Sequence, residues 1–129
     1  MKPSGAATKA NLVVVIDDDA LVLEATGGLL RSWGFQVVTA GSYWEAMTRL
    51  GKVGRRPDLI ISDYRLSEGA TGVDVIEGLR HAFAIPALLI SGDGSSPQSD
   101  NGAGPYRLLH KPVNAETFRA LVDASVLAR

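Results

Sequence analysis

The sequence predicts an α/β fold in which five parallel strands form one doubly wound sheet with helices on both faces. Five short apolar runs recur along the chain, and the first of them, LVVVI, is rich in β-branched residues. Stretches with helical spacing of apolar residues separate most of these runs, and such alternation is typical of a parallel sheet. The chain has 129 residues, 46% of them hydrophobic and 21% charged, so its size and composition match one globular domain.

The first strand is expected at residues 12–16, after a terminal segment without apolar periodicity. We expect residues 1–10 to form a flexible tail and residues 11–129 to form the domain. The run LVVVI is apolar on both faces, as in a buried parallel strand. A helix should follow, capped by Asp18 or Asp19 and ended by Gly34, and FQVVTA should form the second strand.

The middle of the chain predicts two further helices around a third strand. Ser42 and Glu45 fit the S-x-x-E capping box, which begins a helix running to about Leu50. GKVGRRP then interrupts the chain, and DLIIS forms the third strand. The loop RLSEGATG leads to a helix with one apolar face, made of Val75, Ile76 and Leu79.

The last third of the chain contains two strands and one weak connection. ALLIS follows Pro86 as the fourth strand, and YRLLH is the fifth. Between them, GDGSSPQSDNGAGP has no apolar periodicity, so the fourth helix of the alternating pattern is expected to be short or missing. Asn114 caps a final helix whose buried side is formed by Phe118, Leu121, Val122 and Val126.

Composition excludes several classes of function. The net charge of -1, without any run of basic residues, argues against direct binding of nucleic acid. No cysteine is present, which excludes disulfides, thiolate metal sites and cysteine nucleophiles. The longest apolar run is too short to cross a bilayer, so we expect a cytoplasmic domain without direct membrane contact.

His81 and His110 lack metal-ligand spacing, and Trp33 and Trp44 are expected in the core.

Polar residues follow the ends of four of the five predicted strands. In an open α/β sheet, ligands bind beyond the carboxyl ends of the strands, so these residues are expected to converge. The first strand is followed by two carboxylates and the third ends next to one. The residues concerned are Asp17, Asp18, Asp63, Ser91, Gly92, His110, Lys111 and Pro112.

This set of side chains is suited to phosphoryl transfer. Three carboxylates at one edge repel one another unless a cation neutralises them, and oxygen ligands without His or Cys suit Mg²⁺. The ammonium of Lys111, the hydroxyl of Ser91 and the amide of Gly92 are donors that the oxygens of a transferring phosphoryl group require. Asp63 is then the expected nucleophile.

Four motifs, VVVIDDD, PDLIISDYRL, LLISGD and LLHKPV, resemble in order and spacing the receiver domain of two-component response regulators. The resemblance spans residues 12 to about 128. It implies a flavodoxin-like sheet with strand order 2-1-3-4-5. It also implies a phosphoacceptor domain that promotes its own phosphorylation and dephosphorylation, rather than an enzyme acting on a separate substrate.

The resemblance assigns a role to each site residue. Asp63 takes a phosphoryl group from a phosphohistidine of a histidine kinase or a histidine phosphotransfer domain. Mg²⁺ is held by Asp17, Asp18, Asp63 and the backbone carbonyl of Arg65. Ser91, Gly92 and Lys111 bind the phosphoryl oxygens, and the Lys111-Pro112 bond is expected to be cis. The local sequence around these motifs most resembles receivers fused to hybrid histidine kinases, in which the parent chain is a kinase. We also expect a monomer or weak dimer.

Two departures from the family pattern affect the expected output. Receivers usually carry Tyr or Phe where this chain has Leu108, although Tyr106 lies on the same strand face. The usual output helix falls at residues 95–103, here SSPQSDNGA, so we expect signalling through another face or onward phosphotransfer. Arg65 and Asp93 flank the expected reaction centre and are expected to tune dephosphorylation.

Two alternative functions remain open. An aspartate-nucleophile phosphatase needs an acidic residue two positions after the nucleophile, where this chain has Arg65. A pseudo-receiver would bind proteins without being phosphorylated.

Overall fold

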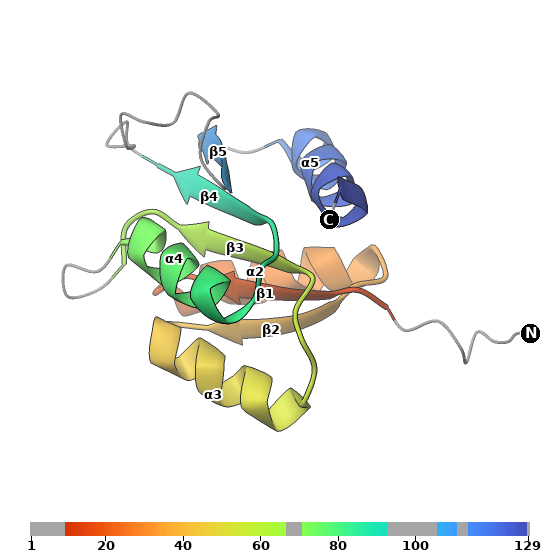
Figure 1. Ribbon diagram of the computed structural model, residues 1–129. Coiled ribbons are helices and arrows are strands. Elements are labelled where there is room, and N and C mark those ends of the chain that lie inside the picture. Colours follow the sequence, from red (N-terminus) through yellow and green to blue (C-terminus); the bar gives the residue numbers. More distant parts are fainter. Residues whose placement is uncertain (1–9, 67–70, 93–105, 111–113, 129) are drawn as a thin grey trace, which may run out of the picture.

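The computed structural model describes residues 10–66, 71–92, 106–110 and 114–128 (Figure 1). Strands and helices alternate through most of this part of the chain. Their bounds are β1 Leu12–Ile16, α2 Ala20–Ser32, β2 Gln36–Ala40, α3 Tyr43–Val53, β3 Leu59–Asp63, α4 Gly72–Ala82, β4 Ala87–Ser91, β5 Tyr106–His110 and α5 Ala115–Ala128. Residues 1–9 of the predicted tail and the segment 93–105 lie outside the described residues.

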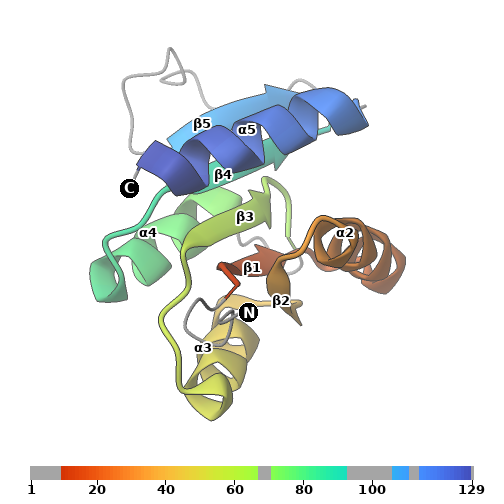
Figure 2. The ribbon, with the colours of Figure 1, turned by 90° about the vertical axis from the view of Figure 1, so that its right-hand side faces the viewer.

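All five strands pair in parallel in the order β2-β1-β3-β4-β5, which confirms the predicted fold class and strand order. Helices α3 and α4 cover one face of the sheet, and α2 and α5 cover the other (Figures 1 and 2). Four helices are found in the described part of the chain, and the predicted short or missing helix falls within residues 93–105, outside that part. The order places β1 and β3 side by side in the middle of the sheet.

The alternation of side chains along the buried strands creates two separate cores. One core lies between the sheet and helices α3 and α4, whose buried residues are Ala46, Leu50, Val75, Ile76 and Leu79. The other lies between the sheet and helices α2 and α5, whose buried residues are Leu30, Phe118, Val122 and Val126. Burial on both faces explains why β1, β3 and β4 are apolar along nearly their whole length.

The helix ends follow the predicted capping residues, with one difference. Asp19 caps α2, because its Oδ1 accepts from the amide of Leu21 at 2.9 Å. Ser42 caps α3, and Asn114 accepts from the first turn of α5. However, α3 continues past Leu50 and ends at Gly54, where φ is 72°. A glycine such as Gly51 weakens a helix without ending it, whereas a left-handed residue ends it.

The prediction that both tryptophans are core residues is wrong for Trp44. Its side chain is 76% exposed and stacks edge-on against Tyr43, with ring centroids 5.1 Å apart. Ala46 and Leu50, four residues apart, form the buried face of α3, and Trp44 projects from the opposite side. Trp33 is half-buried and packs against Phe118 of α5, with centroids 5.8 Å apart.

Candidate functional site

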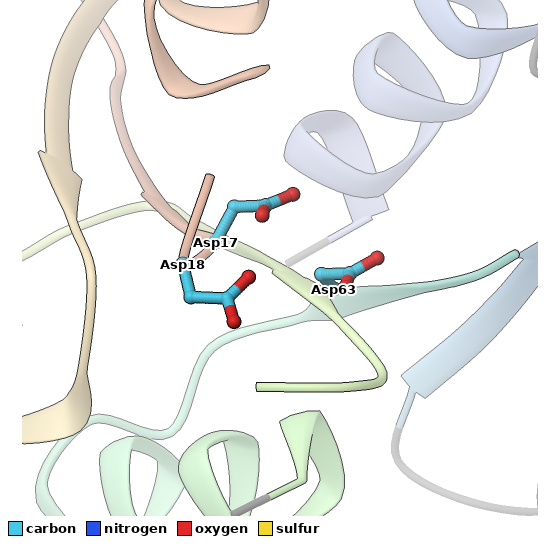
Figure 3. Close-up of side chains that lie close together, drawn as sticks. All are labelled: Asp17, Asp18 and Asp63. Atoms are coloured by element: carbon cyan, nitrogen blue, oxygen red, sulfur yellow. The ribbon is translucent and has the colours of Figure 1, made fainter. Parts of the chain in front are cut away.

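Three carboxylates lie together where β1 and β3 end. The register pairs Ile16 with Ser62, so the residues that follow, Asp17 and Asp63, are neighbours across the two strands. Asp17, Asp18 and Asp63 each offer an oxygen within 4.8 Å of the others. Figure 3 shows the three side chains gathered beside the strand ends. The structure therefore brings together the three aspartates that the strand-end pattern selected.

The neighbouring backbone holds Asp17 in place. The Asp17 side chain is only 6% exposed, and its Oδ1 accepts from the amide of Asp19 at 2.9 Å. The amide of Asp17 donates to the carbonyl of Ala40 at the end of β2, at 3.1 Å. Asp18 is exposed and Asp63 is half-buried, so the group runs from the protein interior to solvent.

The backbone around Asp63 is held by groups from β4, β3 and α4. The amide of Tyr64 donates to the carbonyl of Ile90 at 2.7 Å, and the hydroxyl of Ser62 donates to the carbonyl of Asp63 at 3.0 Å. The amide of Gly72 donates to the carbonyl of Tyr64 at 2.7 Å. Arg65 forms an isolated antiparallel bridge with Thr71, so the chain returns to the end of β3 after the loop.

Ser91 ends β4, the strand next to β3. Its side chain is 1% exposed, and its Oγ has no hydrogen-bond partner among the described residues. A buried hydroxyl without a partner is costly, and this one lies at the strand end next to Asp63. Gly92 follows and is exposed. Lys111, Pro112 and the predicted cis bond between them lie outside the described residues, as does Asp93.

A pocket of about 520 Å³ opens beside Asp17 and Asp63. It lies between α2 and α5 and is mostly apolar. Its described lining consists of Val15, Ile16, Asp17, Val22, Thr26, Leu29, Ile61, Asp63, Ile90, Gly92, Ala115 and Phe118. Asp17 and Asp63 thus border an open volume that a small reactant can enter.

The donors present at this site fit a hard divalent cation. Carboxylate oxygens are the ligands that Mg²⁺ takes, and Mg²⁺ normally keeps several waters and uses one or two carboxylates. Neither histidine belongs to the acidic group, and both His81 and His110 are exposed. Leu108 is half-buried against the core under α3 and α4, and the side chain of Tyr106 lies outside the described residues.

Sequence reasoning did not select Gly72, which packs against the backbone of Asp63. A Cβ built on Gly72 would meet the carbonyl oxygen of Asp63 and the hydroxyl of Ser62. The sequence carries no clear signal for this contact, because Gly72 is the first residue of α4 and the penalty for glycine applies to helix interiors.

Among the described helices, none is both long and apolar enough to span a bilayer.

Comparisons with known proteins agree with the fold. The family model for the response regulator receiver domain matches residues 13–123. The chain is 32% identical over 117 residues to the transcriptional regulatory protein KdpE of Mycobacterium tuberculosis, covering 89% of this chain and 50% of KdpE. It is 22% identical over 121 residues to the phyllosphere-induced regulator PhyR of Methylorubrum extorquens, covering 94% of this chain and 45% of PhyR.

Solved structures give the same result. A response regulator receiver protein from Sinorhizobium medicae superposes with a TM-score of 0.79 and 26% identity, covering 92% of this chain and 96% of that one. The chain spans about half the length of the curated relatives that it matches. With the family model matched over most of its length, this chain belongs to the response regulator receiver domains.

Proposed function

We propose that this chain is the phosphoacceptor of a two-component phosphorelay and that Asp63 takes the phosphoryl group. The observation that carries the proposal is the group of three aspartates at the ends of β1 and β3, in a chain that belongs to the receiver family. Asp63 is half-buried, borders the pocket and has its backbone held from several sides. A nucleophile held in one position lowers the entropic part of the barrier.

In this proposal Asp17, Asp18, Asp63 and the backbone carbonyl of Arg65 hold Mg²⁺. The ion would supply neutralisation of the carboxylates and of the charge on the phosphoryl oxygens. Asp17 would hold the ion through a water and Asp18 would bind it directly, and the place of both residues in the acidic group supports this assignment.

The reaction is a displacement at phosphorus. A carboxylate oxygen of Asp63 attacks, an oxygen-phosphorus bond forms and the nitrogen-phosphorus bond of the donor phosphohistidine breaks. The imidazole keeps the electron pair and takes a proton from solvent. Ser91 Oγ, the amide of Gly92 and the ammonium of Lys111 bind the phosphoryl oxygens. For Ser91 this role is supported by its buried hydroxyl, which has no partner among the described residues.

The cellular context of the proposal follows the family. The donor would be a histidine kinase or a histidine phosphotransfer domain, and the receiver domain, residues 11–129, would work in the cytoplasm as a monomer or weak dimer. Direct contact with nucleic acid or membrane is not part of its role. Fusion to a hybrid histidine kinase and output through an unusual face stay predictions.

Phosphorylation by a small donor tests the proposal. Incubation with acetyl phosphate and Mg²⁺ should add the mass of one phosphoryl group to the intact protein, as measured by mass spectrometry. Asp63→Asn should abolish the addition, because the amide is not a nucleophile, while Asp58→Asn at the opposite end of β3 should leave it in place. Phosphorylation that persists in Asp63→Asn, or that is absent in the unaltered protein, would contradict the proposal.

One observation favours a second candidate, a pseudo-receiver that binds proteins. A solved relative is described as the anti-anti-sigma factor PhyR from Bartonella quintana, 25% identical with a TM-score of 0.74. An unaltered protein that binds a partner equally well with and without phosphodonor would support this candidate. The phosphatase alternative has no such support, because Arg65 stands where its general acid is needed.

A further inference from the structure

The backbone of Gly72 approaches the end of β3 so closely that no side chain fits between them. A Cβ on Gly72 would lie 2.9 Å from the Ser62 hydroxyl and 2.6 Å from a methyl group of Leu89. Its distance from the carbonyl oxygen of Asp63 would be shorter than either. The Ser62 hydroxyl and the Leu89 methyl belong to side chains, but the Asp63 oxygen belongs to the backbone and cannot turn away.

The reason for glycine at this position is steric. Among the described glycines, the left-handed ones are Gly34 and Gly54, so Gly72 is not required by its φ angle. What this position requires is the absence of a Cβ, because the carbonyl of Asp63 occupies the space that a Cβ would need.

Neither side of this contact can move easily. Helix α4 begins at Gly72, is capped by Thr71, which accepts from the amide of Asp74, and is buried along Val75, Ile76 and Leu79. On the other side, β3 is a central strand, paired with both β1 and β4. The amide of Gly72 also donates to Tyr64, one residue after Asp63. An added methyl group would therefore displace the backbone of Asp63.

We propose that Gly72 is a positioning residue that sets the place of the Asp63 carboxylate relative to Asp17 and Asp18. This inference rests on the proposed function, because it takes Asp63 as the nucleophile. Residues 64 and 65 continue from the same strand end, so the carbonyl of Arg65 is positioned by the same contact. Misplacement of a reacting group by about 1 Å can cost a hundredfold in rate.

The test compares Gly72→Ala with two other glycine-to-alanine variants. Gly78 lies in the same helix, but the three atoms nearest to a Cβ there all belong to the ring of Tyr43, a side chain that can turn. Gly28 lies in α2, and a Cβ there would meet nothing within 4 Å. Both controls alter a helix without touching the backbone of Asp63.

Phosphorylation rates are measured with saturating acetyl phosphate and Mg²⁺, well below the unfolding midpoint of each variant, and Mg²⁺ affinity is measured by calorimetry. Gly72→Ala should be phosphorylated at least tenfold more slowly and should bind Mg²⁺ more weakly, whereas Gly78→Ala and Gly28→Ala should stay within about twofold of the unaltered protein. A merely structural role would lower the midpoint and leave the rate and the affinity of the folded protein unchanged. That result would overturn the inference.

Failure of the proposed function gives a different result. If the unaltered protein takes no phosphoryl group, the proposed function fails, yet the Mg²⁺ affinities of Gly72→Ala and Gly78→Ala still decide whether Gly72 positions the aspartates. If Gly72→Ala does not fold, amide chemical shifts of the unaltered protein are compared with and without Mg²⁺ and beryllofluoride. The amide of Gly72 should shift more than that of Gly78, and equal or absent shifts would overturn the inference.

Discussion

At the scale of single residues, Ser91 shows how a functional group can oppose stability. Its hydroxyl is buried and has no partner in the described part of the chain. We expect Ser91→Ala to leave the free energy of unfolding unchanged or to raise it by up to about 1 kcal/mol, because an unsatisfied polar atom is removed. The same variant should be phosphorylated more slowly, because a donor to the phosphoryl oxygens is lost.

Ser62 is the matched control for Ser91, since it is equally buried and lies on the neighbouring strand. Its hydroxyl donates to the Asp63 carbonyl, so Ser62→Ala should lower the free energy of unfolding by about 1 kcal/mol. Urea denaturation of both variants measures the sign of each change in the free energy of unfolding. A clear loss of stability in Ser91→Ala would show that its hydroxyl already has a partner in the free protein.

The contrast between the aspartates and Gly72 shows which site residues a sequence can reveal. Asp17 and Asp63 follow recognisable strands, and parallel strands end at one edge, so their convergence follows from topology alone. The importance of Gly72 depends on how closely α4 approaches β3, and no periodicity in the chain encodes that distance. The prediction that Trp44 lies in the core was wrong for a related reason, because an aromatic residue in a helix does not by itself show which face of the helix packs against the sheet.

At the scale of elements, two consecutive aspartates between β1 and α2 have different roles. Asp19 caps α2 by accepting from the amide of Leu21. Asp18 belongs to the acidic group instead. We expect Asp19→Ala to lower the free energy of unfolding by about 1 kcal/mol and to keep Mg²⁺ binding. We expect Asp18→Asn to weaken Mg²⁺ binding at least tenfold, because one charged ligand is lost.

Calorimetric titration and thermal unfolding of these two variants test the separation. Each variant serves as the control for the other, since the changes lie on consecutive residues. If Asp19→Ala lost Mg²⁺ binding as strongly as Asp18→Asn, the cap would also be a ligand, and the assignment of the acidic group would need revision.

The elements themselves were largely predictable. The five short apolar runs form the five strands. The signal was clearest for β1, β3 and β4, because strands buried on both faces are apolar along nearly their whole length. Helix ends were less certain. The end of α3 moved to Gly54, since the position that adopts a left-handed φ, and not the first glycine, ends a helix.

At the scale of the whole molecule, the site joins elements that are far apart in the sequence. Asp17 and Asp63 come from β1 and β3, and the contact of Trp33 with Phe118 links α2 to α5 beside the same pocket. The guanidinium of Arg119 lies 5.4 Å from the centre of the Trp33 ring and extends that contact. A ligand that binds the aspartates therefore requires the central sheet to be folded.

This requirement predicts that Mg²⁺ stabilises the entire domain. A ligand that binds only the folded state raises the free energy of unfolding by RT ln(1 + [L]/Kd), or about 2.7 kcal/mol at a hundred times Kd. Thermal unfolding midpoints should therefore rise with Mg²⁺ and return to the starting value when EDTA removes the ion. The rise should be lost in the double variant Asp17→Asn with Asp18→Asn, and K⁺ at equal ionic strength should not reproduce it. An equal rise in the double variant would place the bound ion elsewhere, because ions held by other surface carboxylates would be unaffected by these changes at the end of β1.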